Sequence, residues 1–347
     1  MKKANGIFKT ALLALTLCVM ASACAPKENQ LPTTKKGIMD AFVAGTLPES
    51  YAPAAFFVHF ANNQKVGMPA VNAHLQFLLK TNADILKVQF EQRVQRVTGD
   101  LNEQETWDNI GPIPVDFYRP TVEIIKNINE IAGKDVYVSP TVYSAYQVAR
   151  QALGDDNIAK AAAERPEDLK RVLGYYLEAL EWYVQELKNI GIESFYMTTQ
   201  GGEMKYNSIP GFYSDIIKPF DLKLMNQCQE GAKLTLLHIC DWEGTYDDLT
   251  RYLDYPGDIV NVPLALNGTP VTLSDAEKLF GRPVLGGFDR KGHVINKGSE
   301  EEVAAVVKEA IANGPKGRVM IGADCTVSDA PIKNIHAAIS AAHNSAE

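Results

Sequence analysis

The feature that most constrains the fold of this chain is an alternation. Short apolar runs rich in Val, Ile, Leu and Phe recur, and longer amphipathic segments separate them. In these runs both the odd-numbered and the even-numbered positions are apolar, so both faces of an extended segment would be apolar. This pattern is typical of parallel strands that are buried on both faces. Eight runs qualify as strands: Ala55 to Phe60, Asp84 to Gln89, Asp135 to Thr141, Ser194 to Gln200, Lys233 to Cys240, Asp258 to Pro263, Arg282 to Phe288 and Arg318 to Asp324.

The segments between these runs carry helix start and stop signals. Pro166 suits the first turn of a helix and Gly191 suits its end. Two segments have the form of a capping box, 274–277 and 299–302. Eight βα units in one chain predict an α/β fold, a single (β/α)8 TIM barrel, with an open doubly wound sheet as the alternative.

Composition supports a large globular domain. The chain has 347 residues, of which 46% are hydrophobic and 22% charged, and it lacks the apolar run of about 18 residues that a spanning helix needs. Its 34 basic and 42 acidic residues give a net charge of −8. An acidic chain is poorly suited to bind nucleic acid or an anionic membrane surface, so we expect no nucleic-acid partner.

The first residues resemble an export signal. A start that contains three lysines is followed by the apolar segment 11–20 and then by Ala21-Ser22-Ala23-Cys24. We expect residues 1–23 to be a signal peptide and Cys24 to be the lipid-modified first residue of a bacterial lipoprotein. Ordinary cleavage after Ala23 and an uncleaved anchor are the alternatives. Residues 24–50 then form an irregular tether and lead-in, and residues 51–347 form the barrel domain, held at the periplasmic or outer membrane by lipid alone.

Three cysteines remain in the expected domain, and an odd number argues against complete disulfide pairing. His238 and Cys240 end the fifth run on one face, with Cα atoms roughly 7 Å apart, and Cys325 directly follows the eighth run. In a barrel both strand ends lie at the mouth, so the three side chains suit a zinc site with an open fourth position. The alternatives are a core histidine with two buried cysteines, or a disulfide. Cys228 lies in a predicted helix and is expected to be structural.

Six motifs together resemble the uroporphyrinogen decarboxylase superfamily. They are Asn82 to Lys87, Thr199 to Gly202, His238 to Cys240, Phe280 to Asp289, Gly298 to Val303 and Gly322 to Cys325. The resemblance covers about residue 50 to the end and implies a barrel of that type. His-x-Cys with a distant Cys is similar to the branch of zinc-dependent, corrinoid-linked methyltransferases, which implies His238, Cys240 and Cys325 as metal ligands.

The sequence departs from the family at two places. The segment 51–63 has no Arg or Lys where decarboxylases carry an arginine-rich motif that holds a substrate with many carboxylates. Asp241 stands where the family commonly has glycine. The first departure argues against decarboxylation of a porphyrin precursor, and the second alters the loop beside the expected metal.

Further residues at the expected mouth are candidates for catalysis or ligand binding. The resemblance implies substrate contact for Asp84, and strand parity excludes that Asp84 and Lys87 both line the barrel. His59 and Gln200 complete the catalytic candidates. Candidates for cofactor binding are Tyr143 with the aromatic residues Tyr196 and Trp242, the glycine pair Gly201 and Gly202, and Asp289 as a fourth ligand or hydrogen-bond acceptor. Ordinary roles in packing, turns and capping are the alternatives.

Three functions follow as hypotheses. The first is a zinc-dependent methyltransferase that activates a small thiol for methyl transfer from a corrinoid, carried by a partner protein, or from a similar donor. The second is uroporphyrinogen decarboxylase activity. The third is a lipid-anchored protein that binds a tetrapyrrole or corrinoid without turnover.

Overall fold

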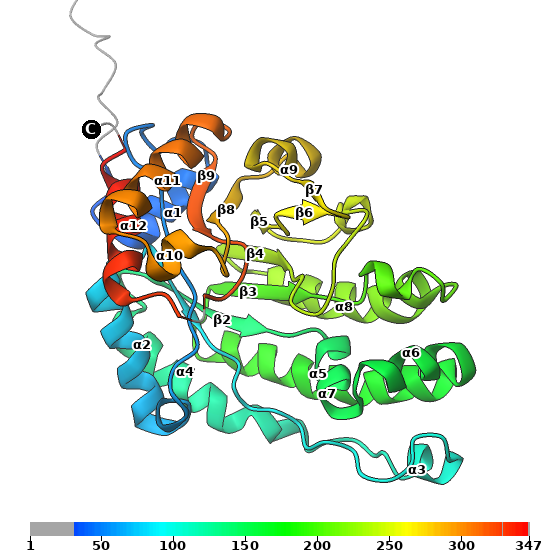
Figure 1. The fold of residues 1–347 in the computed structure, drawn as a ribbon. Helices are drawn as coiled ribbons and strands as arrows, with labels where there is room; N and C mark the ends of the chain where they lie inside the picture. The colour runs from blue at the N-terminus through cyan, green and yellow to red at the C-terminus, as the bar shows by residue number, and fades with distance from the viewer. Residues whose placement is uncertain (1–30, 328, 346–347) are drawn as a thin grey trace, which may run out of the picture.

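Seven of the eight predicted runs form regular parallel strands in the computed structural model, which describes residues 31–327 and 329–345. Within those residues the strands lie side by side in chain order and form one curled sheet (Figure 1). Each strand falls on one of the predicted runs. They are β1 (Ile85–Val88), β2 (Tyr137–Val142), β3 (Ser194–Thr199), β4 (Leu234–Ile239), β5 (Ile259–Asn261), β8 (Val284–Phe288) and β9 (Val319–Ala323).

The first predicted run, Ala55 to Phe60, is extended but is not a regular strand. Ala54 forms a parallel bridge with Ile321, Val58 forms one with Val327, and the carbonyl of Ala54 accepts from the amide of Asp84. The segment therefore lies between β9 and β1, where an eighth strand would close the barrel. Its pairing is interrupted because β9 ends before the second bridge. The prediction of a complete eight-stranded barrel is thus corrected to a curled seven-stranded sheet in the described residues.

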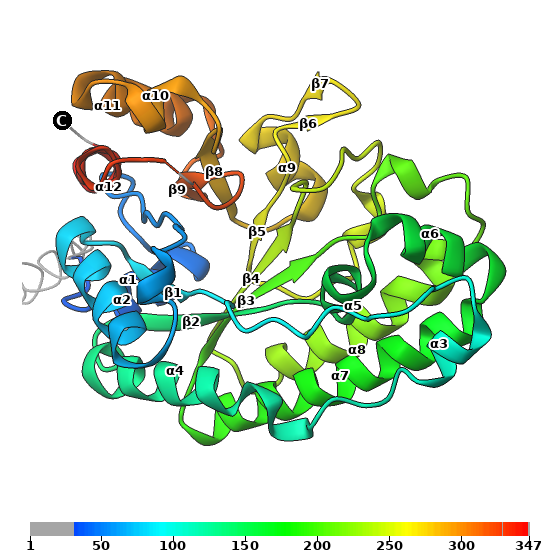
Figure 2. The same ribbon diagram turned by 60° about the horizontal axis from the view of Figure 1, so that its bottom comes forward.

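Helices cover the outer side of this sheet, as Figure 2 shows. Neighbouring helices also pack on one another around the outside, α2 against α4 and α12, and α7 against α8. Their bounds are α1 (Lys35–Val43), α2 (Gly67–Thr81), α3 (Gln104–Asp108), α4 (Arg119–Ala132), α5 (Ala145–Leu153), α6 (Asp155–Glu164), α7 (Pro166–Asn189), α8 (Lys218–Gln229), α9 (Leu273–Phe280), α10 (His293–Lys297), α11 (Glu300–Asn313) and α12 (Ile332–His343).

Shorter elements decorate the ends of the sheet. An antiparallel hairpin of β6 (Ala265–Leu266) and β7 (Thr269–Pro270) follows β5. The short 3₁₀ segments η1 (Asn62–Gln64), η2 (Val115–Tyr118), η3 (Met204–Tyr206) and η5 (Thr250–Tyr252) lie in loops, and η4 (Phe212–Ile217) is a π-helical segment before α8. Among the residues described, no helix is both long enough and apolar enough to span a membrane.

The helix signals in the sequence are confirmed with one shift. Pro166 begins α7 as predicted, and Ser299 caps α11 through the amide of Glu302. The helix α9 is capped by Thr272 and not by Ser274, because Thr272 and Asp275 exchange side-chain and main-chain hydrogen bonds. Ser274 instead donates to the carbonyl of Asn313.

The lead-in contains a helix where the sequence predicted irregular chain. Thr34 caps α1, and Ile38, Met39 and Phe42 of this helix are buried in the core. The apolar spacing of these three residues gives α1 one face that the domain covers. The segment from Lys35 onward is therefore part of the folded domain, whereas the predicted signal and Cys24 lie outside the described residues.

Candidate metal centre

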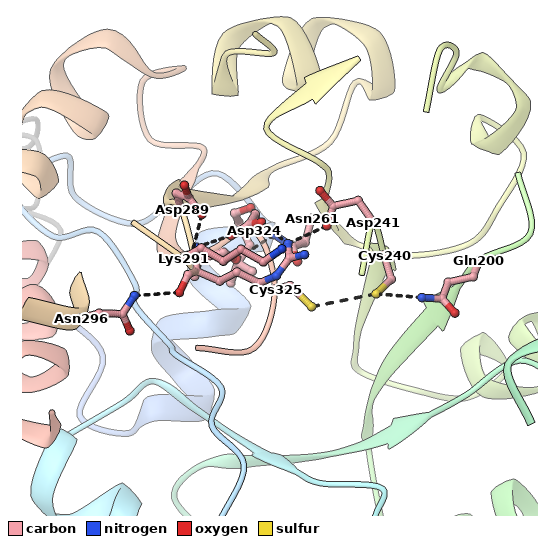
Figure 3. Close-up of polar contacts among 12 residues, drawn as sticks. Gln200, Cys240, Asp241, Asn261, Asp289, Lys291, Asn296, Asp324 and Cys325 are labelled. Atoms are coloured by element: carbon pink, nitrogen blue, oxygen red, sulfur yellow. Dashed lines mark hydrogen bonds and ion pairs between the residues drawn. The ribbon is translucent and has the colours of Figure 1, made fainter. Parts of the chain in front are cut away.

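Three side chains from two distant strands converge at the carboxyl-end rim of the sheet. His238 lies on β4, Cys240 directly follows β4, and Cys325 lies two residues after the end of β9. All three are buried, and one ligand atom from each lies within 4.8 Å of the others. Figure 3 shows the two sulfurs facing each other across the site. The predicted convergence of His238, Cys240 and Cys325 is confirmed as geometry.

The spacing of the two sulfurs suits a shared metal ion. The Sγ atoms of Cys240 and Cys325 lie 4.0 Å apart, and both thiols are free. Two thiolates on a tetrahedral zinc, each at about 2.3 Å, lie about 3.8 Å from one another. A disulfide requires about 2.05 Å. The pair therefore has the spacing of two zinc ligands, and the alternative of a disulfide does not describe this structure.

The imidazole of His238 has no nitrogen or oxygen partner among the described residues, and the polar group that interacts with it is the sulfur of Cys325. Both of its ring nitrogens are buried, and its ring stacks on Tyr196 with centroids 5.4 Å apart. Buried polar groups in folded proteins are nearly always hydrogen-bonded. A core histidine with satisfied nitrogens, the alternative from the sequence, is therefore wrong. Such an imidazole beside two thiols is the ligand set that zinc prefers, with a fourth position left for water or substrate.

The two thiols differ in acidity because they are hydrogen-bonded to each other. The contact between the two sulfurs lowers the pKa of Cys325 well below its usual range, with His238 and Arg290 adding to the effect. The same hydrogen bond, together with burial, raises the pKa of Cys240. The Nε2 atom of Gln200 also donates to the sulfur of Cys240 at 3.3 Å. The pair thus favours one thiolate before any metal binds.

A cavity of about 270 Å³ lies directly over these ligands. Its wall includes the predicted aromatic residues Tyr143, Tyr196 and Trp242. Three cationic side chains also line it, Lys87, Arg93 and Arg150, and the last of these pairs at 2.8 Å with Glu243, the acidic residue of the lining. The cavity combines an aromatic wall, positive charge and two sulfurs, so it suits a small ligand that carries negative charge.

Lys87 lines this cavity, although the sequence analysis named Asp84 and not Lys87 as the candidate for substrate contact. It is buried, its Nζ atom lies 5.1 Å and 4.9 Å from the ring centroids of Phe57 and Tyr196, and it donates to Gln89. Burial lowers its pKa to about 8, against the opposing charges of the two cysteines. The alternation of side chains along a strand allowed only one of Asp84 and Lys87 to point into the barrel. The family resemblance favoured Asp84, whereas in the structure Lys87 lines the cavity.

Asp84 lies at the opposite rim, before the first residue of β1. It is fully buried, and hydrogen bonds or ion pairs of 2.7–2.8 Å join its carboxylate to Tyr51, the amide of Ala54, Lys35 and His343. These contacts tie α1 and α12 to the sheet. Asp84 does not line the cavity, so its predicted contact with substrate is wrong.

The glycine pair after β3 is enclosed by protein. Gly201 has a φ of +96° and its amide donates to Glu203. A Cβ atom on Gly202 would lie 2.2 Å from the hydroxyl oxygen of Tyr252. Neither glycine borders the cavity over the metal ligands. The two positions therefore need glycine for chain packing, and the prediction that they approach a ligand is wrong.

The other candidates are distributed as follows. Asp289 is exposed and accepts from the amide of Lys291 in a turn, so it is not a fourth ligand. His59 lies at the edge of the cavity, 38% exposed, and pairs with Glu91 at 2.8 Å. Cys228 is buried in α8, as expected, and does not belong to the group of ligands.

Comparison with known proteins supports the fold. No family model and no curated protein matches the sequence. Among solved structures, a methyltransferase from Methanosarcina mazei matches with a TM-score of 0.70 at 15% identity, covering 89% of this chain and 98% of that chain. A B12-independent methionine synthase from Shewanella sp. W3-18-1 matches with a TM-score of 0.51 at 16% identity, covering 85% and 93%. This chain therefore shares its fold with both proteins, and at these identities the likeness extends to the fold alone.

Proposed function

We propose that this protein is a zinc-dependent methyltransferase that methylates the sulfur of a small thiol. The observation that carries the proposal is His238, a buried imidazole with no nitrogen or oxygen partner among the described residues, beside two sulfurs 4.0 Å apart. When bound, zinc would supply a Lewis acid that lowers the pKa of a thiol near neutral pH. The two proteins of like fold, named as a methyltransferase and a methionine synthase, support the reaction class.

The side chains around the site suit this reaction. His238, Cys240 and Cys325 would hold the ion, and Gln200 holds the sulfur of Cys240 by its hydrogen bond. Lys87 places a buried cation in the same cavity, and its described contacts include no carboxylate partner. This charge favours a thiolate over a thiol. In the transfer, the thiolate sulfur forms a bond to the methyl carbon while the bond from carbon to the donor breaks, and the donor keeps that electron pair.

The size of the cavity favours a small acceptor over a macrocycle. Its volume of about 270 Å³ is near the lower end of the range for drug-sized ligands. A tetrapyrrole or corrinoid is too large to enter it, which argues against the decarboxylase and tetrapyrrole-binding alternatives. We therefore propose that the donor, a methylcorrinoid on a partner protein or a similar compound, reaches the thiol at the mouth.

Location in the cell is a separate part of the proposal. We infer from the sequence that Cys24 carries lipid after removal of residues 1–23, and that residues 24–50 join this anchor to the domain. Replacing Cys24 with Ala should release the protein into the soluble envelope fraction. Membrane association that is unchanged in the Cys24→Ala protein would contradict the lipid anchor.

The reaction is tested with reduced, zinc-loaded protein. We expect formation of a methyl thioether, detected by mass spectrometry, when a panel of small thiols is incubated with methylcobalamin or a methylfolate. Cys240→Ala should abolish the product and Cys228→Ala should retain it, since Cys228 lies in α8. Absence of any thioether with every donor and thiol would contradict the proposal. Loss of CO₂ from uroporphyrinogen would favour the decarboxylase instead.

A further inference from the structure

The two strands that carry the cysteine ligands are not neighbours. In the sheet, β5 and β8 lie between β4 and β9. No ladder of main-chain hydrogen bonds therefore joins the chain at Cys240 to the chain at Cys325, and the sheet alone does not fix the distance of 4.0 Å between their sulfurs. A contact across the two loops would add to the constraint that the curled sheet provides.

Arg290, in the loop after β8, makes that contact. Its Nη1 atom donates to Asp241 at 2.7 Å and to Asp324 at 2.5 Å. Asp241 follows Cys240 in the chain, and Asp324 precedes Cys325. Figure 3 shows both carboxylates beside the sulfur pair, with dashed lines for the contacts between the residues drawn. One guanidinium thus binds the residue next to each cysteine ligand.

The guanidinium is itself held in place. Its side chain is only 6% exposed, its main-chain amide donates to Asp324 at 2.6 Å, and its carbonyl accepts from Asn296. It also lies 5.2 Å from the ring centroid of Trp242, which lines the cavity. An arginine side chain does not lose its proton in proteins, so this cation is permanent. The positive charge of Arg290 is therefore present at every pH at which the protein is folded.

We propose that Arg290 is a positioning residue that sets the separation of the Cys240 and Cys325 sulfurs and thereby the affinity of the site for metal. Without the cation, the carboxylates of Asp241 and Asp324 repel each other across the site and the two loops separate. Groups that orient metal ligands from behind typically contribute a factor of about 10–100 in affinity. The proposal rests on the metal site of the proposed function and not on methyl transfer.

The experiment compares three variants by metal affinity. Arg290→Met removes the cation, and Asp241→Asn removes only the charge of the partner next to Cys240 and leaves the buried pair with Asp324 intact. Arg171→Met is the matched control, because Arg171 also contacts an aspartate and a carbonyl, Asp168 and Trp107, but lies on α7, away from both cysteine loops. Zinc affinity is measured by competition with a chromophoric chelator, and the ligand set by the absorption spectrum after loading with Co²⁺.

We expect Arg290→Met to weaken zinc binding by about 10–100-fold, with altered ligand-field bands of Co²⁺, and Asp241→Asn to weaken it by about 10-fold. Arg290→Lys should restore part of the affinity, and Arg171→Met should match the wild type. Wild-type affinity and an unchanged cobalt spectrum in Arg290→Met would overturn the proposal. If Arg290→Met does not fold, wild-type affinity in Asp241→Asn would overturn it.

The outcomes distinguish a failure of the proposed function from a failure of the proposal for Arg290. A protein that binds zinc through this site but methylates no thiol contradicts the methyltransferase and leaves the role of Arg290 in metal affinity intact. Conversely, a methyltransferase whose zinc affinity does not respond to Arg290→Met or to Asp241→Asn contradicts only the positioning role.

Discussion

Two buried polar clusters lie at opposite rims of the sheet and differ in how they are satisfied. At the amino-end rim, the carboxylate of Asp84 has four partners, two of them cationic or able to become so. At the carboxyl-end rim, both nitrogens of His238 have no nitrogen or oxygen partner among the described residues. A satisfied cluster stabilises the fold, whereas an unsatisfied one is built for a group the chain does not supply.

The contrast agrees with the division of labour in barrel folds. Residues at the amino ends of the strands usually serve stability, and those at the carboxyl ends serve chemistry. Asp84 joins α1 and α12 to the sheet, while His238, Cys240 and Cys325 face a cavity. The following predictions test whether the two clusters are as independent as this comparison implies.

The largest effect is expected at the metal ligands. Wild-type reduced protein should hold about one zinc per chain, and Cys240→Ala or Cys325→Ala should lose most of it, because two remaining ligands bind weakly. Cys228→Ala should retain the zinc, since that thiol is buried in α8. Metal analysis of the purified proteins measures this. Equal zinc in all three variants would show that the cluster is not a metal site.

The next effect is on stability, at the other rim. Asp84→Ala should lower the free energy of unfolding by about 3 kcal/mol, because it leaves Lys35 and His343 without their anion. Urea titration of the metal-free protein measures the loss, with the exposed Asp289→Ala as a control that should change little. Zinc affinity of folded Asp84→Ala should equal that of the wild type. A large loss of affinity would show that the rims are coupled.

The smallest expected effect is on how the free energy of unfolding depends on pH, which should differ between the buried carboxyl groups of Asp221 and Asp84. Asp221 accepts from Thr199 and Tyr255 but has no cationic partner, and burial raises its pKa to about 7. Its folded pKa exceeds the unfolded value, so its contribution to stability is full below about pH 4 and is lost as pH rises through about 7. Partner contacts outweigh burial at Asp84 and lower its pKa, so the contribution of that group is lost only on acidification.

Asp221→Asn should therefore flatten the pH profile. The free energy of unfolding of the wild type should fall by about 2 kcal/mol between pH 5 and pH 7 on account of this group, and the variant should lack that fall. Urea titrations at pH 5, 6, 7 and 8 measure both proteins. Parallel profiles would show that Asp221 is ionised in the fold throughout this range.

Local patterns predicted most of the fold. The strands β1 to β5, β8 and β9 fall on apolar runs that are visible in the sequence, because burial on both faces demands such runs. The exception is the segment at 55–60, which is apolar enough for a strand but finds a partner, β9, that ends before Val327. A regular strand forms only where a neighbouring strand offers main-chain hydrogen bonds. The residue at which that neighbour ends cannot be inferred from the sequence of the first segment.

The convergence of His238, Cys240 and Cys325 was also predictable, because the topology of a parallel barrel brings all strand ends to one rim. The choice between Asp84 and Lys87 was not, since parity states that they point apart but not which one points inward. The roles of Gly201 and Gly202 are ambiguous in the same way. A glycine permits another group to come close to the backbone, but the sequence does not show whether that group is a ligand or another part of the protein. In this protein Ile217 lies against Gly201 and Tyr252 lies against Gly202.

By itself, the sequence determined the order of the strands and the two strand ends from which His238, Cys240 and Cys325 project. Only the tertiary structure decided that the two sulfurs meet at 4.0 Å, that the nitrogens of His238 have no nitrogen or oxygen partner in the described part of the chain and that Arg290 bridges both cysteine loops. The physical reason is that periodicity and capping act over a few neighbouring residues. The separation of side chains 85 positions apart depends instead on how the whole sheet curls and on which charges remain near one another after it has closed.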